Sequence, residues 1–251
     1  MRRDVPCNAS SSIIFGGELG WKADEWTDSD DRVRGGNSQS HLRIYRAHAV
    51  FNGHLDIDTL GGAGFASQRT SGDDHHWDLS RFEGIQITFD PSHTDEKTYT
   101  FILKDELLPQ DPDTGREKST TSWEYDFSIK TACIYGANPS LRTVTIHWDA
   151  LKPTYRGRPK ADAKPLTKAD VRRMSIMMRS FFGTQKGEFT LDLYSISGIA
   201  GGNNMETDTP SPMTDNDDQD SITGYDKPAA YAEVLKKPNL LLNILCCGLK
   251  L

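Results

Sequence analysis

Apolar and polar residues alternate along much of the first 200 positions of this chain. The stretches Ile85-Gln-Ile-Thr-Phe89, Trp123-Glu-Tyr-Asp-Phe-Ser-Ile129 and Val144-Thr-Ile-His-Trp148 place an apolar side chain at every second position. A period of two is that of a β-strand with one face buried and the other in water, which antiparallel sheets allow. These stretches therefore predict half-buried antiparallel strands.

Less regular patterns predict further elements. His41 to Phe51 resembles one long strand whose phase shifts between Ile44 and Tyr45, so we expect a β-bulge there. Pro165 to Val171 predicts a single helical turn capped by Thr167. Additional strands are expected at Ile13–Phe15, Tyr99–Leu103, Met174–Met178 and Phe189–Ile199.

Roughly nine strands with almost no helix predict an all-β fold, a β-sandwich of the jelly-roll kind. The composition changes after Gly201: residues 203–221 hold acidic side chains, two prolines and no basic residue. Such a segment cannot bury enough apolar surface to fold. We therefore expect an N-terminal extension (1–12), a sandwich domain (13–202), a disordered acidic linker (203–227) and an apolar tail with a short helix (228–251).

Charge and hydropathy narrow the classes of partner. The net charge is −7 and the mean hydropathy is −0.59, so no overall field attracts nucleic acid. The basic run Tyr155–Lys160 is interpreted as a solvated loop.

No apolar run reaches the roughly 18 residues that span a bilayer. The four cysteines lack a CxxC spacing, which favours a reducing compartment over a zinc site or a disulfide framework.

The polar stretch Asp28–Ser38 has several interpretations. Asp28, Asp30 and Asp31 offer oxygen ligands that could bind calcium, but the simpler interpretation is a solvated turn whose carboxylates pair with nearby arginines. The Gly35-Gly36 pair fits either a tight structural turn or a recognition loop. The residues that we assign to a recognition loop are Asp30, Arg32, Arg34, Gly35, Gly36, Asn37 and Ser38.

Catalytic chemistry has little support in the sequence. His75-His76-Trp77-Asp78 places two histidines on opposite sides of an extended chain, which makes a poor metal site. No nucleophile elbow occurs and no pair of carboxylates stands out. We predict a protein that is not an enzyme, with no catalytic residue, no metal site and no cofactor.

The end of the chain offers two alternatives. Cys246-Cys247 lies in a leucine-rich segment and could be acylated, which would attach the protein reversibly to a membrane. The same segment could instead fold back onto an apolar patch of the sandwich.

Several blocks resemble one known family. Trp26, the Gly35-Gly36 pair and Ser38 are similar to the signature of the complex I intermediate-associated proteins. Collinear agreement continues through Phe51–Leu55, Gly64–Ser67, Asp78–Gly84, Tyr99–Phe101, Leu151–Arg158, Pro165-Leu166 and Gly187–Leu191. The resemblance covers about residues 13–200.

The resemblance implies a galactose-binding-like jelly roll without established catalytic residues. It also implies a chaperone-like assembly factor that holds intermediates of mitochondrial respiratory complex I, with those intermediates and other assembly factors as partners and a mitochondrial location. The arginines and serines of the first residues suit a presequence, whereas Asp4 and Pro6 do not. A cytosolic paralogue therefore stays open, acting as a carbohydrate- or protein-binding module.

Overall fold

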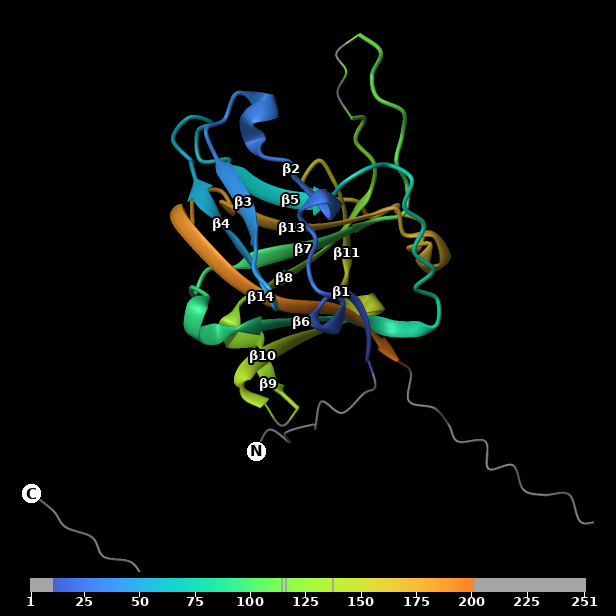
Figure 1. The fold of residues 1–251 in the computed structure, drawn as a ribbon. Helices are drawn as coiled ribbons and strands as arrows, with labels where there is room; N and C mark the ends of the chain where they lie inside the picture. The colour runs from blue at the N-terminus through green and yellow to red at the C-terminus, as the bar shows by residue number, and fades with distance from the viewer. Residues whose placement is uncertain (1–10, 114, 116, 137, 201–251) are drawn as a thin grey trace, which may run out of the picture. The chain divides into compact units, whose positions relative to one another are not determined.

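Two antiparallel sheets account for most of the chain that the structure describes (Figure 1). The structure is a computed structural model and describes residues 11–200 apart from positions 114, 116 and 137. The predicted linker (203–227) and tail (228–251), including Cys246 and Cys247, lie outside the described residues, as does most of the predicted N-terminal extension (1–12). Those domain predictions stay predictions.

The first sheet, called sheet A, runs in the order β3-β4-β14-β6-β10-β9, and β1 also pairs with β14. Its strands are β1 (Ser11–Gly16), β3 (Gln39–Ile44), β4 (Ala49–Leu55), β6 (Phe82–Asp90), β9 (Cys133–Tyr135), β10 (Asn138–His147) and β14 (Gly187–Ala200). The long strand β14 is its centre. Gly187 to Leu193 pair with β4, whereas Ser195 to Ile199 pair with β1, and β6 lies on the other side.

The second sheet, called sheet B, runs in the order β12-β11-β8-β7-β13-β5-β2. Its strands are β2 (Trp26–Asp28), β5 (Phe65–Thr70), β7 (Tyr99–Lys104), β8 (Ser122–Phe127), β11 (Lys152–Tyr155), β12 (Arg158–Pro159) and β13 (Arg173–Arg179). Every pairing in both sheets is antiparallel.

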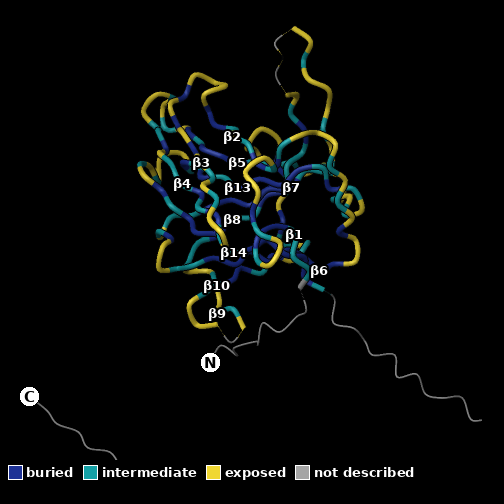
Figure 2. Tube along the Cα trace, viewed as in Figure 1, coloured by how far each residue is buried: buried dark blue, intermediate teal, exposed yellow. Residues whose placement is uncertain are grey.

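The inner faces of the two sheets share one apolar core. Phe89 of β6 lies 6.4 Å, centroid to centroid, from Phe127 of β8, and Tyr99 of β7 lies 6.5 Å from Phe189 of β14. Burial follows the strands, and exposure follows the loops that join them (Figure 2). The predicted β-sandwich of the jelly-roll type is confirmed.

Single 3-10 turns connect the strands, and the described residues contain no α-helix. The turns are η1 (Gly17–Leu19), η2 (Ala23–Glu25), η3 (Asp31–Arg34), η4 (Pro91–His93), η5 (Ile129–Thr131), η6 (Trp148–Ala150) and η7 (Lys168–Asp170). The predicted turn at Pro165–Val171 is η7, but the Thr167 side chain makes no capping hydrogen bond.

Two strand predictions were wrong in detail. β3 ends at Ile44 and β4 begins at Ala49, so the shift between Ile44 and Tyr45 is a hairpin turn and not a bulge. The amide of Tyr45 donates to the His48 carbonyl at 2.9 Å and closes this turn. The outer faces of the central strands are not wet. Thr88 and Thr100 are almost fully buried, because neighbouring strands and longer side chains such as that of Asp126 cover them.

Candidate functional site

The chain passes from sheet B to sheet A between β2 and β3, and this crossing holds the predicted recognition loop. Asp30 and Asp31 follow β2, and η3 begins at Asp31. Both carboxylates are buried, with 3% and 0% of the residue exposed. A buried carboxylate is stable only where donors surround it, so the partners of these two residues decide what the loop does.

Asp31 joins the start of β3 to the start of β5. Its carboxylate accepts hydrogen bonds from the amide of Ser38 at 3.0 Å, the hydroxyl of Ser38 at 2.7 Å and the amide of Phe65 at 3.0 Å. Since β3 belongs to sheet A and β5 to sheet B, one side chain holds the two layers together at this edge.

Asp30 makes the same kind of hydrogen bonds two residues further along both strands. Its carboxylate accepts from the amide of Ser40 at 3.1 Å, the hydroxyl of Ser40 at 2.6 Å and the amide of Ser67 at 2.9 Å. A calcium ion would have to displace these donors, so the calcium interpretation does not fit Asp30 and Asp31.

The solvated-turn interpretation was therefore wrong for Asp30 and Asp31 and holds only for Asp28. Asp28 is half-exposed and forms an ion pair with Arg32, which also lies 3.4 Å from Asp30. Arg34 has a different contact: its guanidinium carbon lies 5.3 Å from the centre of the Phe65 ring. Backbone amides are the partners of Asp30 and Asp31 because these two side chains are buried between the sheets.

The glycine pair has a structural cause at each position. Gly35 adopts the left-handed conformation, with φ of 83°, which favours glycine. At Gly36 an added Cβ would lie 2.3 Å from Oδ1 of Asp31. The geometry is that of the tight turn, and it closes the loop over the buried carboxylate.

The predicted recognition loop is only partly exposed. Asp30, Gly36 and Ser38 are buried, whereas Arg32, Arg34, Gly35 and Asn37 are exposed. The exposed side chains that remain for a partner stand beside Val33, which is 59% exposed. The side-chain amide of Asn37 donates to the Thr59 hydroxyl at 2.8 Å. The predicted loop therefore divides into a buried frame and an exposed rim.

A line of alternating arginine and phenylalanine side chains leads from this rim across sheet B. Arg34 stacks on Phe65, Phe65 lies opposite Arg179 in the β5–β13 pairing, and the Arg179 guanidinium carbon lies 4.6 Å from the centre of the Phe181 ring. We call these four residues the arginine–phenylalanine row. Sequence reasoning missed Phe65, Arg179 and Phe181 because their proximity depends on strand register.

The row ends at a strained aromatic doublet. Phe181 and Phe182 have φ of 45° and 58°, a left-handed conformation that is unfavourable for bulky residues. The amide of Ser180 donates to the Gly64 carbonyl at 2.9 Å, and the Gly64 amide donates to the Ser180 hydroxyl at 3.1 Å, which fixes the start of this loop. Two residues further along, Phe182 is 93% exposed.

Ion pairs stiffen the outer face of sheet B beside the row. Arg179 contacts Glu124 at 2.7 Å and Asp126 at 2.6 Å. Buried Arg173 pairs with Asp73 and Glu117. Arg69, Lys104 and Arg173 share Glu117 as their carboxylate partner on this face.

Burial also affects the cations of this face. It lowers the pKa of Lys104 below the usual lysine range, and it lowers the pKa of Arg69 in the same way. Burial of a charged group disfavours its charged form, and Glu117 partly compensates for both groups. The nearby charge of Arg173 also lowers the pKa of both groups.

The histidines that the sequence singled out are separated in the structure. His75 stacks on Trp77 with ring centres 4.3 Å apart, whereas His76 contacts Asp170 at 2.6 Å. Trp77 packs against the core and exchanges backbone hydrogen bonds with Val171. Trp77 thereby anchors this polar loop to the core. Within the described residues, no helix is long and apolar enough to cross a membrane.

Known structures share parts of this architecture at low similarity. A family 11 carbohydrate-binding module of a cellulosomal cellulase of Clostridium thermocellum is 12% identical, with a TM-score of 0.49 over 77% of this chain and 96% of that chain. A carbohydrate-binding module specific for non-crystalline cellulose is 10% identical, with a TM-score of 0.37 over 77% of this chain and 97% of that chain. Likenesses of this size carry no argument about a ligand.

Sequence similarity is much stronger. An uncharacterized protein of Schizosaccharomyces pombe is 43% identical over 192 residues, which are 74% of this chain and 83% of that protein. The pattern of the family described as Complex I intermediate-associated protein 30 matches residues 15–193, almost the whole described sandwich. The chain therefore belongs to the Complex I intermediate-associated protein 30 family.

Proposed function

We propose that this chain is a non-enzymatic assembly factor that holds protein intermediates of mitochondrial respiratory complex I. Membership of the family supports a role related to complex I assembly. The contacts that would carry the interaction are those of the arginine–phenylalanine row and of Phe182 at its end.

The aromatic doublet of half-buried Phe181 and exposed Phe182 carries this proposal. Arginine and aromatic residues are enriched among the residues that contribute most to protein interfaces. A phenylalanine in the left-handed conformation and 93% exposed contributes little to the stability of the isolated domain. Strain of this kind is commonly retained at functional sites. We therefore assign Phe182 as the anchor that a partner protein covers.

The buried aspartates have a supporting role. Asp30 and Asp31 fix the crossing from which Arg34 reaches Phe65. Arg32, Arg34 and Asn37 would then form the rim of the interface, whereas Asp30, Gly36 and Ser38 would act only through the fold. This division narrows the recognition loop that the sequence predicts.

The test compares Phe182→Ala with Leu19→Ala in the full-length tagged protein. Leu19 is also exposed, at 64%, but lies on η1, next to β1 of sheet A rather than on sheet B. Affinity purification from mitochondria should recover complex I intermediates with wild-type protein and with Leu19→Ala, and lose them with Phe182→Ala. A deletion strain with fully assembled complex I on a native gel would contradict the assembly role.

Carbohydrate binding is the second proposal, and the same residue favours it. Exposed aromatic rings provide apolar faces against which a sugar ring can pack. A glycan array probed with the full chain separates the two functions. Binding to a glycan that Phe182→Ala abolishes, without loss of complex I intermediates, would favour a cytosolic binding module over an assembly factor.

A further inference from the structure

A group of carboxylates and imidazoles lies on the outer face of sheet A, where His48, His93 and Asp192 line a cleft of about 580 Å³. The walls come from the β3–β4 hairpin, which contributes Tyr45 and His48, and from η4 and β14. Asp90, His93 and Asp192 each offer one ligand atom, and these atoms lie within 4.8 Å of one another. Among the residues that the structure describes, no other such group occurs.

The backbone fixes the two carboxylates opposite each other. Asp90 ends β6 and Asp192 lies in β14, and the two residues are directly paired across the strands. Like charges in directly opposite positions destabilise a sheet. Asp192 is 3% exposed, so water does little to separate the charges. A positive charge between the two carboxylates would remove this repulsion.

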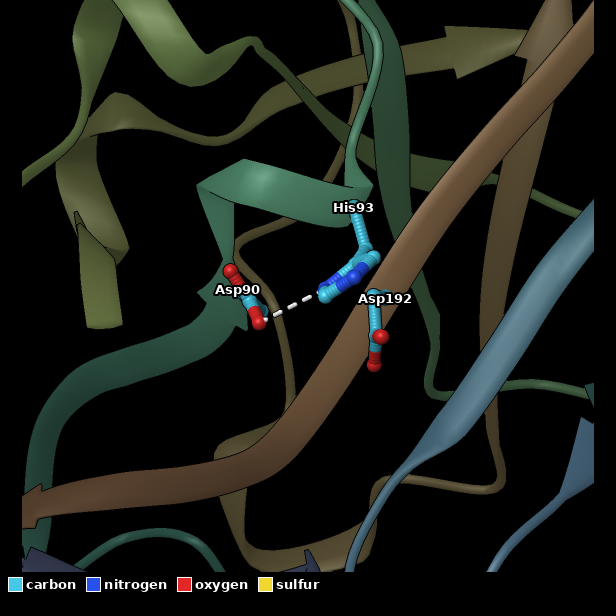
Figure 3. Close-up of side chains that lie close together, drawn as sticks. All are labelled: Asp90, His93 and Asp192. Atoms are coloured by element: carbon cyan, nitrogen blue, oxygen red, sulfur yellow. Dashed lines mark hydrogen bonds and ion pairs between the residues drawn. The ribbon is translucent and has the colours of Figure 1, made fainter. Parts of the chain in front are cut away.

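The imidazoles are arranged around these carboxylates. His93 extends from η4 toward Asp90 (Figure 3), with its Nδ1 2.9 Å from a carboxylate oxygen of Asp90. A metal ion would take the place of the proton in this contact, so Nδ1 of His93 and the Asp90 carboxylate would both become ligands. On the other side, Nδ1 of His48 lies 2.6 Å from Oδ1 of Asp192 and holds that carboxylate in place, as the partners of metal ligands commonly do.

We propose that Asp90, His93 and Asp192 form a binding site for a divalent transition-metal ion of the zinc class. Two carboxylates and one imidazole suit zinc better than calcium or magnesium, which take oxygen ligands almost exclusively. Zinc bonds of about 2.0–2.2 Å separate tetrahedral ligand atoms by about 3.3–3.6 Å. Ligand atoms within 4.8 Å of one another therefore have to approach by at most about 1.5 Å.

Three protein ligands leave one coordination position open, as in zinc sites that accept a further ligand. Tyr45 and Val50 line the same cleft. A fourth metal ligand that entered the cleft would therefore lie beside an apolar wall. The site lies on sheet A and shares no residue with the arginine–phenylalanine row of sheet B. It goes beyond the proposed function and does not depend on it.

Zinc chloride titrated into the full-length, metal-stripped protein tests the site by calorimetry, at about pH 7.5 because protons compete for the ligands. The cysteines are first blocked with N-ethylmaleimide. Wild-type protein should bind one zinc ion, and His93→Ala and Asp192→Asn should weaken binding by at least about tenfold. His93 is exposed, so its replacement leaves the fold intact.

His54→Ala is the matched control. His54 contacts Glu188 at 2.7 Å on the same sheet but has no third ligand, so this variant should bind zinc like the wild type. The proposal fails if the wild type binds no zinc, if His93→Ala binds it equally well, or if calcium at the same concentration displaces it.

Discussion

Replacing Asp31 by alanine should strongly destabilise the crossing between the sheets. The carboxylate is fully buried and accepts from two backbone amides, those of Ser38 and Phe65, and from one hydroxyl. The Ser38 hydroxyl lies 3.3 Å from the Asp56 carbonyl and can turn to it, but the two amides cannot move. A buried donor without a partner costs about 1–3 kcal/mol. We therefore expect a loss of about 2–6 kcal/mol.

Urea unfolding followed by tryptophan fluorescence measures this loss. With a slope of about 2 kcal/mol/M for a domain of this size, the midpoint should fall by about 1–3 M. Asp28→Ala is the matched control, because that carboxylate is half-exposed and pairs with exposed Arg32. Its loss should stay below about 1 kcal/mol. Equal midpoints for the two variants would refute the claim that Asp31 joins the sheets.

Three further changes test other parts of the account. Gly36→Ala places a methyl group 2.3 Å from Oδ1 of Asp31, so thermal melting should show a loss similar to that of Asp31→Ala; an unchanged melting temperature would contradict the close packing. Phe182→Asn suits the left-handed backbone, so its free energy of unfolding should equal that of the wild type or exceed it by up to about 1 kcal/mol; marked destabilisation would mean that Phe182 belongs to the core. Tyr99→Phe removes a hydroxyl that donates to Asp95 at 2.9 Å and should cost about 1–2 kcal/mol in urea unfolding; no change would show that water replaces it.

The strands were largely predictable from the sequence because alternation records which side chains face the core. Ile85, Ile87 and Phe89 are all completely buried, as their spacing indicates. The same pattern could not distinguish a bulge from a hairpin at Ile44 and Tyr45. A bulge leaves one extra residue unpaired within a strand, whereas a hairpin ends one strand and begins the next. Polar residues after Ile44 are compatible with either structure.

The candidate sites were harder to predict, because their residues meet through sheet register. Phe65 and Arg179 are neighbours only because β5 pairs with β13. Asp90 and Asp192 face each other only because β6 pairs with β14. A local signal existed at Phe181-Phe182-Gly183, where two aromatics and a glycine follow a strand. The burial of Asp30 and Asp31 had no local signal, since acidic residues beside arginines normally indicate a solvated turn.

A photo-crosslinking amino acid at position 182 tests the central claim most directly. Phe182 is 93% exposed, so the replacement should leave the fold intact and place the reactive group against whatever covers this surface. Irradiation of intact mitochondria should produce crosslinks to subunits of complex I intermediates, with few or none from the same group at exposed position 19. Crosslinks from position 19 alone, or none to complex I subunits from position 182, would contradict the account.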